Sequence, residues 1–220
     1  MTLDFKLANK LKEWLVSRNV SFDDKGFPLI PKNSYVKNKP KYIAPWNHRK
    51  SYCAKITSIC FYMNDNYIYP RIEKVFDEIN ELKKYHSVCG IDLSVSKKMN
   101  RNVQRFIIYL NALYNAVLAY SGIKIIPSLR FGDETTLKYL MIYKESSIFA
   151  IGIHGSSKYM KLSSYDEYLF RLMILIFNPK ILLLYGKPNK KEKDILENIN
   201  INYKVYNDYR RLYKKGIKIC

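Results

Sequence analysis

Three apolar runs in this chain each lead directly into a group of polar residues. The runs are 88–91, 125–129 and 148–153, and the polar residues that follow them are Asp92, Ser94, Arg130, Asp133, Glu134, His154 and Lys158. Apolar, β-branched runs of this length are typical of strands buried on both faces. In parallel α/β sheets and barrels, sites are built at the C-terminal ends of the strands, because the loops converge there. The pattern therefore predicts a site at this edge, without naming its ligand or reaction.

Helical segments alternate with these runs. Helices are predicted at 3–16, 69–85, 102–121, 135–143, 165–177 and 190–198. Further apolar runs at 56–62, 180–185 and 203–206 predict additional strands. Gly122 is placed to end the long central helix, and the side chain of Asp133 is placed to cap the helix that follows it.

Strands that alternate with helices predict an α/β fold with a mainly parallel sheet of five to six strands and helical crossovers. The number of units is too small for a complete eight-stranded barrel. Periodicity leaves an open doubly wound sheet and a partial barrel as alternatives. We favour the open or partly closed sheet.

The chain divides into two parts of unequal character. Residues 1–55 are expected to form an N-terminal helix and a basic, proline-rich arm packed on the domain. Residues 56–220 are expected to form the α/β domain, with a basic C-terminal tail. Four prolines between 23 and 46 exclude a long helix there, so this stretch is predicted to be extended over the domain.

Charge changes the picture of the arm. The net charge is +19, from 38 basic and 19 acidic side chains, and no Asp or Glu occurs between 25 and 64. Basic groups neutralise phosphates and aromatic faces stack on bases, so this mixture predicts a surface for DNA or RNA. A solubility bias, or aromatic anchoring of the arm on its own domain, are the alternatives. The residues predicted to contact nucleic acid are Lys37, Lys39, Lys41, Arg49, Lys50, Lys158, Arg210, Arg211, Lys214 and Lys215.

Other classes of protein are not supported. The sequence has no apolar run long enough to span a membrane and no signal-peptide pattern, so we expect a cytoplasmic protein without a membrane partner. The four cysteines form no C-x-x-C pair and the three histidines are scattered, which predicts no metal site and reduced, buried thiols. Neither a P-loop nor a catalytic triad is visible, and the sequence identifies no cofactor.

The strand-end motifs resemble those of a known family. In chain order they are GIDLS at 90–94, IPSLRFGDE at 126–134, AIGIHG at 150–155 and PKILLLYG at 179–186. They are similar to domain-of-unknown-function family 4417, a family of uncharacterised phage and mobile-element proteins, and the resemblance covers roughly 56–206. Phe131 stands where members often carry tryptophan, which keeps an aromatic residue at that position. The resemblance implies a phage or mobile-element setting and no particular activity.

Three interpretations of the strand-end residues remain open. In a structural interpretation, Asp92 pairs with Arg130 and Asp133 caps a helix. In a second, Arg130 and Lys158 hold a phosphate group. In a third, the group serves a metal-dependent hydrolase or nuclease. The residues that would carry such a reaction are Asp92, Arg130, Asp133, Glu134 and His154.

The function expected from these observations is that of a phage or mobile-element accessory protein. It would bind a polyanion, nucleic acid above all, through the basic arm and tail. One alternative is an enzyme that acts on nucleic acid or nucleotides, with its site at the C-terminal strand ends. Another is an anti-defence protein that binds a host protein or ribonucleoprotein.

Overall fold

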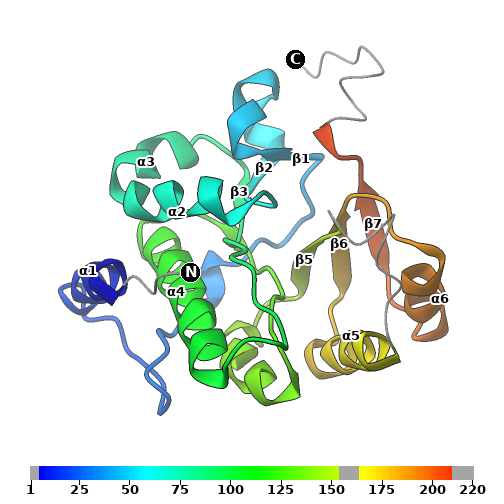
Figure 1. The fold of residues 1–220 in the computed structure, drawn as a ribbon. Helices are drawn as coiled ribbons and strands as arrows, with labels where there is room; N and C mark the ends of the chain where they lie inside the picture. Colours follow the sequence, from blue (N-terminus) through cyan, green and yellow to red (C-terminus); the bar gives the residue numbers. More distant parts are fainter. Residues whose placement is uncertain (1–4, 154–163, 210–220) are drawn as a thin grey trace.

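Seven short strands alternate with helices in the computed structural model, which describes residues 5–153 and 164–209 (Figure 1). The strands are β1 (Tyr42–Pro45), β2 (Thr57–Cys60), β3 (Ser87–Cys89), β4 (Ile125–Ile126), β5 (Ile148–Gly152), β6 (Ile181–Tyr185) and β7 (Tyr203–Tyr206). The α-helices are α1 (Phe5–Val16), α2 (Asp65–Glu73), α3 (Val75–Leu82), α4 (Arg101–Tyr120), α5 (Ser164–Phe177) and α6 (Lys190–Asn198). Short 3-10 helices are η1 (Lys32–Ser34), η2 (Trp46–Ser51), η3 (Ala54–Ile56) and η4 (Glu134–Tyr143). The α/β class predicted from periodicity is confirmed.

All strand pairs are parallel, and the strands lie side by side in the order of the chain. β1 to β4 form a four-stranded sheet, and β5 to β7 form a three-stranded one. The sheets meet just beyond β4, where the N–H of Ala150 donates to the Pro127 carbonyl at 2.9 Å. A doubly wound sheet reverses its strand order at a switch point, and the described strands show no such reversal. The open doubly wound alternative therefore does not describe this fold.

The number of strands also exceeds the five to six expected from the sequence. The strand that the pattern misses is β1, which lies inside the stretch predicted to be an extended arm. Its apolar pair Ile43-Ala44 is short and is followed at once by Pro45, so it does not stand out as a strand. Proline is tolerated there because β1 lies at the edge of its sheet.

The strands curve around a shared interior. Every strand contributes at least one side chain to a single buried cluster, which includes Ile43, Cys60, Cys89, Ile126, Ile148, Ala150, Leu183, Tyr185 and Tyr206. At about 4.8 Å per strand, β1 and β7 would lie about 29 Å apart in a flat sheet. However, the hydroxyl of Tyr206 in β7 donates to the carbonyl of Pro40, just before β1, at 2.6 Å. The strands of the two sheets therefore curve around a filled interior, and we refer to this arrangement as the barrel.

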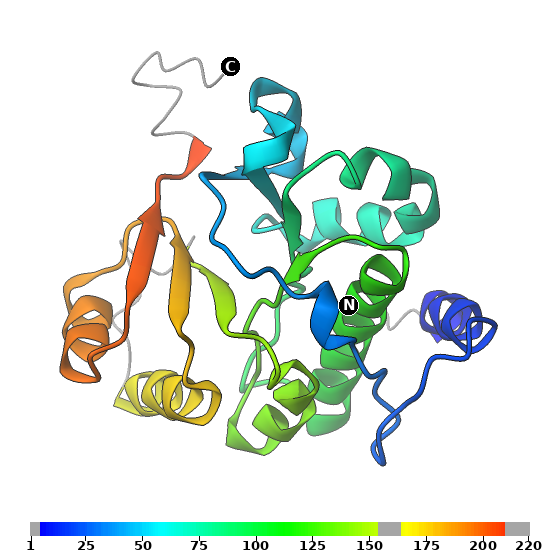
Figure 2. The same cartoon turned by 180° about the vertical axis from the view of Figure 1, so that it is seen from behind.

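The segment 35–41 lies across the N-terminal end of this barrel. The N–H of Val36 donates to the carbonyl of Ile125 at 3.3 Å, and the N–H of Lys41 donates to the carbonyl of Ile56 at 2.9 Å. Figure 2 shows the segment running from the side of α4 toward β7 before it turns into β1. We call the N-terminal ends of the strands, together with this segment, the amino-terminal edge. The opposite ends of the strands form the carboxyl-terminal edge.

The helices lie outside the strands and bury a second apolar core against them (Figure 1). α4 is buried along most of its length; Asn100 caps its start, and Gly122, with φ of +84°, follows its end. α1 packs on the outer side of α4, where the rings of Phe5 and Phe106 are 4.7 Å apart. The predicted helix 69–85 is instead two helices, α2 and α3.

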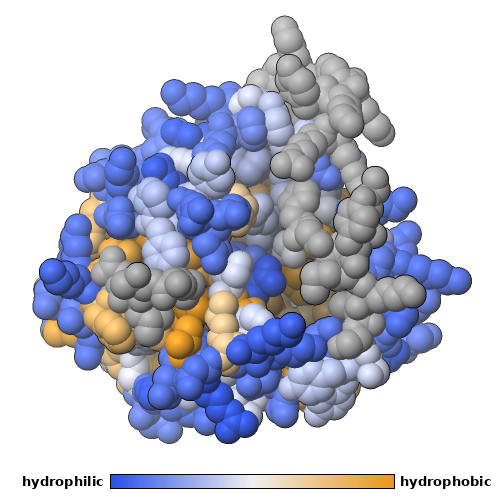
Figure 3. Space-filling view, in the orientation of Figure 1, coloured by the Kyte–Doolittle hydropathy of each residue, from blue (hydrophilic) through white to orange (hydrophobic). Residues whose placement is uncertain are grey.

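The surface is largely polar. Figure 3 shows hydrophilic side chains over most of the face seen in Figure 1, with smaller apolar areas between them. Among the described residues, no helix is both long enough and apolar enough to cross a membrane.

Candidate functional site

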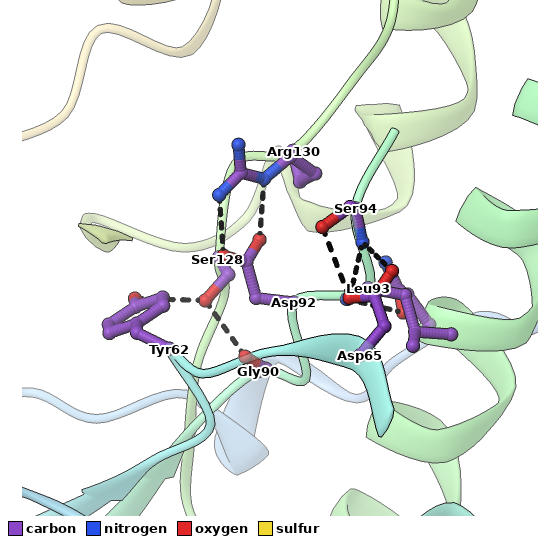
Figure 4. A network of polar contacts seen from close by, with 9 residues as sticks. Tyr62, Asp65, Gly90, Asp92, Leu93, Ser94, Ser128 and Arg130 are labelled. Atoms are coloured by element: carbon purple, nitrogen blue, oxygen red, sulfur yellow. Dashed lines mark hydrogen bonds and ion pairs between the residues drawn. The ribbon is translucent and has the colours of Figure 1, made fainter. Parts of the chain in front are cut away.

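A bidentate ion pair joins two strand ends at the carboxyl-terminal edge. Nε and Nη2 of Arg130, after β4, donate to the two carboxylate oxygens of Asp92, after β3, at 2.8 and 2.7 Å. The Asp92 side chain is only 6% exposed, whereas that of Arg130 is 37% exposed. The charge of Asp92 raises the pKa of Arg130 above its already high ordinary value. Figure 4 shows the third guanidinium nitrogen pointing away from Asp92.

A chain of buried hydroxyl groups runs beside the ion pair. The hydroxyl of Ser128 donates to the carbonyl of Gly90 at 2.9 Å. The hydroxyl of Tyr62, after β2, lies 3.0 Å from the Ser128 oxygen and can donate to it (Figure 4). Burial raises the pKa of Tyr62 well above its ordinary value, so this hydroxyl keeps its proton at neutral pH. The chain ties the ends of β2, β3 and β4 together.

The loop that carries Asp92 is held from two sides. From the start of α2, the carboxylate of Asp65 accepts hydrogen bonds from the backbone N–H and the hydroxyl of Ser94, both at 3.1 Å. From α4, the side-chain oxygen of Asn115 accepts a hydrogen bond from the N–H of Ile91 at 3.1 Å. The loop backbone is therefore fixed on both sides of Asp92, and this fixes the direction of its carboxylate.

Asp133 caps η4, as the sequence predicts. Its carboxylate accepts from the N–H and the hydroxyl of Thr135, at 2.9 and 2.5 Å, and from Gln104 at 3.3 Å. Burial acts to raise the pKa of Asp133, but the hydrogen bonds from Thr135 and Gln104 outweigh it and the pKa is lowered. The neighbouring Glu134 accepts a hydrogen bond from the hydroxyl of Tyr165.

All three acidic residues expected to be catalytic thus have partners within the fold. Asp92 gives both oxygens to Arg130, Asp133 caps a helix, and Glu134 is bonded to a tyrosine hydroxyl. His154 lies outside the described residues. The carboxyl-terminal edge therefore brings Asp92 and Arg130 together as a pair, and it keeps Asp133 in a separate capping role.

Metal and thiol chemistry find little support in the described part of the chain. Within 5–153 and 164–209, no three His, Cys, Asp or Glu side chains are grouped so that they could hold a metal ion. Cys53 is exposed, so the expectation of buried thiols is wrong for this residue. Cys60 and Cys89 lie in the barrel interior, fully buried. Burial raises the pKa of Cys60 well above its ordinary value and that of Cys89 to about 12, so both thiols stay protonated at neutral pH and are poor nucleophiles.

The residues predicted to bind nucleic acid are placed in different ways. Four are exposed and form no ion pair with a described acidic group: Lys37, Lys39, Lys41 and Lys50. Arg49 instead lies with its guanidinium 3.8 Å from the ring centroid of Trp46 and its Nε 3.4 Å from Glu81, and its side chain is 21% exposed. Arg49 therefore contributes to packing. The predicted residues outside the described ranges are Lys158, Arg210, Arg211, Lys214 and Lys215.

Further lysines gather at the amino-terminal edge. Lys55, Lys124 and Lys180 are exposed, and each stands one or two residues before a strand. Lys204 lies in β7 near Lys39; burial lowers its pKa, and the charge of Lys39 lowers it further. The sequence signal is a lysine just before an apolar run. This signal indicates a common surface only when the parallel pairing of the strands is known, because that pairing places the starts of the strands at one edge.

Comparisons with known proteins identify a family without a function. A family model described as "Domain of unknown function (DUF4417)" matches residues 22–204, which is most of the chain. The matched residues include Asp92, Arg130 and the lysines of the amino-terminal edge. No curated protein and no solved structure matches the chain.

Proposed function

The chain belongs to the DUF4417 family, and we propose that it binds a polyanion, namely nucleic acid, through the lysines of the amino-terminal edge. The resemblance of its motifs to phage and mobile-element proteins supplies the setting, that of an accessory protein of such an element in the cytoplasm. DNA and RNA are both candidates, because charge alone attracts either backbone.

One observation carries the proposal: lysines far apart in the chain share an edge where they have no acidic partners. Lys37, Lys39 and Lys41 come from the crossing segment, and Lys55 and Lys180 stand before β2 and β6. None of the five forms an ion pair within the described part of the chain. Like charges held at one edge repel each other, and a bound polyanion supplies the opposite charge.

The aromatic residues of the segment support binding that does not depend on base sequence. Tyr35 in the segment, and Trp46 and Tyr52 just after it, are each at most 5% exposed, so their faces pack in the core. Tyr42 is half-buried, and its ring lies against that of Tyr52, with 6.1 Å between the ring centroids. Stacking on bases requires exposed aromatic faces. Contacts at this edge therefore fall on phosphates, which position a strand but carry no sequence information directly.

The carboxyl-terminal edge gives less support to the enzyme alternative. A general base or a metal ligand needs a free carboxylate oxygen. Both oxygens of Asp92 are taken up by Arg130, and Asp133 is taken up by its cap. The binding function requires no change in these contacts.

Binding assays over a range of salt concentrations test the proposal. Fluorescence anisotropy with single- and double-stranded DNA and RNA of mixed sequence should show affinity that falls steeply between about 50 and 200 mM salt. The triple variant Lys37→Gln/Lys39→Gln/Lys41→Gln should bind more weakly. Its log–log salt slope should be smaller by about 2–3, because each lost phosphate contact removes about 0.7–0.9.

A charge-matched control separates this edge from the rest of the surface. The variant Lys98→Gln/Lys138→Gln/Lys187→Gln removes three exposed lysines that lie elsewhere and should keep nearly the affinity of the parent protein. Absence of binding to all four probes at low salt would refute the proposal. Equal losses in the two triple variants would refute the assignment to this edge.

A further inference from the structure

A pocket opens at the amino-terminal edge, between the crossing segment and the starts of β3 and β4. It has a volume of about 250 Å³ and is lined by Tyr35, Val36, Lys37, Asn38, His86 and Lys124. Pockets that enclose a drug-sized ligand measure about 300–1,000 Å³. The size of this pocket therefore suits a single group of a larger molecule.

The pocket is rich in positive charge and hydrogen-bond donors, and none of its lining residues is acidic. Lys124 uses its ammonium group to donate to the carbonyl of Asn33, and an ammonium group has three N–H donors, so two remain. Lys37 forms no ion pair with any described residue. In addition, the backbone N–H groups of Lys37, Asn38 and Lys39 donate to no described backbone carbonyl.

His86 adds a neutral donor at the wall of the pocket. Its Nδ1 lies 3.0 Å from the hydroxyl oxygen of Ser87. When Nδ1 accepts from this hydroxyl, Nε2 carries the ring proton and can donate to an anion. Burial lowers the pKa of His86, which keeps the ring uncharged at neutral pH.

The pocket brings lysine charge and backbone N–H donors together at one place, whereas a diffuse positive surface needs only exposed lysines. Resting on the proposed function, we propose that this pocket holds a phosphate group of the bound nucleic acid. Lys37 and Lys124 supply the charge, and the backbone N–H groups at 37–39 in the crossing segment supply directed hydrogen bonds to the phosphate oxygens. The phosphate is either the terminal phosphate of a strand or an internal phosphodiester, because both present the same oxygens.

A pair of double variants tests the pocket. Lys37→Gln/Lys124→Gln should lower the affinity for a 3′-labelled oligonucleotide about tenfold, since each lost charged hydrogen bond weakens binding. Lys98→Gln/Lys187→Gln, with the same change in net charge at the opposite edge, should lower it less than about twofold. If the group is a terminal phosphate, the parent protein prefers a 5′-phosphorylated oligonucleotide over its 5′-hydroxyl form, and the first variant loses this preference. If it is an internal phosphodiester, both forms lose affinity equally.

An isosteric pair guards against loss of structure. Asn38→Asp places a negative charge at the pocket with almost no change in shape, whereas Asn66→Asp does so at the start of α2, on the carboxyl-terminal side of β2; both asparagines are exposed. Only Asn38→Asp should have an effect. It should abolish the preference for the 5′-phosphorylated oligonucleotide if the group is a terminal phosphate, or weaken binding about tenfold if it is an internal phosphodiester. If Asn38→Asp and Asn66→Asp behave equally while the parent protein binds, the pocket assignment is overturned and the proposed function stays intact. A parent protein that binds no oligonucleotide overturns both.

Discussion

Asp92 is buried almost completely, and it depends on Arg130 for its charge balance. Arg130→Ala would leave a buried carboxylate without its two charged hydrogen bonds. We expect the free energy of unfolding to fall by about 2–3 kcal/mol. Asp92→Ala should cost less, because Arg130 is partly exposed and water can replace its partner. Measured by urea denaturation, the free energy of unfolding lost in the double variant should be smaller than the sum of the losses in the two single variants.

The same variants separate a structural role from a ligand-binding one. If the pair is structural, Arg130→Ala melts at a lower temperature but binds nucleic acid with unchanged affinity well below its melting point. Weaker binding or lost activity with an unchanged melting temperature would show instead that Arg130 contacts a ligand. Small and strictly additive losses would contradict the coupling that the bidentate geometry implies.

Single residues were predictable from the sequence where their position follows directly from a motif. Asp92 and Arg130 each follow an apolar run, and Asp133 stands two residues before the predicted helix that η4 largely matches, so the pattern finds all three. Tyr62 and Ser128 are different, because each lies inside or beside an apolar stretch where a hydroxyl group carries no positional signal. Their contact depends on the relative register of β2, β3 and β4, which the sequence does not give.

At the scale of elements, η4 offers a test of the cap that begins it. Asp133→Ala should lower the free energy of unfolding by about 1 kcal/mol at neutral pH, the usual cost of a lost cap. Because the pKa of Asp133 is lowered in the folded protein, its ionised form is the stabilising one. Its contribution is full above the unfolded value of about 4 and disappears as pH falls through the lower folded value. The stability difference between the two proteins should therefore narrow in acid, as measured by urea denaturation at neutral and at acidic pH.

Asparagine is the matched control, since it caps helices well but carries no charge. Asp133→Asn should keep most of the stability at neutral pH, and its stability relative to Asp133→Ala should not change with pH. A gap between the parent protein and Asp133→Ala that stays constant down to strongly acidic pH would contradict this account of the cap.

Elements with strong periodicity were predicted well, and those without it were not. The long helix α4 has a capping asparagine before it and a glycine after it, and its observed bounds differ from the prediction by one residue at each end. β1 has only two apolar residues before Pro45, so its pairing with β2 is needed to make it a strand. Helix α2 starts earlier than its apolar pattern because the side chain of Asn64 accepts from the N–H of Asn66.

For the whole molecule, the sequence predicts parallel strands and a site at one edge, but not how far the sheet curves. The curvature of the sheet depends on which side chains of different strands meet in the interior. A strand buried on both faces has the same apolar sequence pattern in an open sheet as in a barrel, so the pattern does not reveal the curvature. Tyr206 and Pro40 are 166 residues apart in sequence, and their contact brings the ends of the barrel together. The same folding gathers Lys39 and Lys204 at one edge, which no local pattern reveals.

The net charge of +19 predicts two salt effects of opposite sign. In the free protein, like charges repel each other and destabilise the compact state. Raising the salt from about 0.01 to 0.15 M shortens the screening length from about 30 to 8 Å, so the melting temperature of the free protein should rise. In the presence of excess oligonucleotide, binding to the folded state adds stability at low salt, and this increment should shrink as salt weakens binding. The melting temperatures of the free protein and of the protein with oligonucleotide should therefore converge as salt is raised.

Thermal melts with and without a mixed-sequence oligonucleotide, at stepped sodium chloride concentrations, measure both effects in one experiment. The variant Lys37→Gln/Lys39→Gln/Lys41→Gln relieves part of the repulsion and removes part of the binding surface. It should show a weaker salt effect when free and a smaller increment from the oligonucleotide. A solubility bias without a ligand predicts the first effect alone, because repulsion needs no partner. An increment that is absent at low salt would therefore indicate that the charge serves solubility alone. An increment that persists unchanged at high salt would contradict binding through charge.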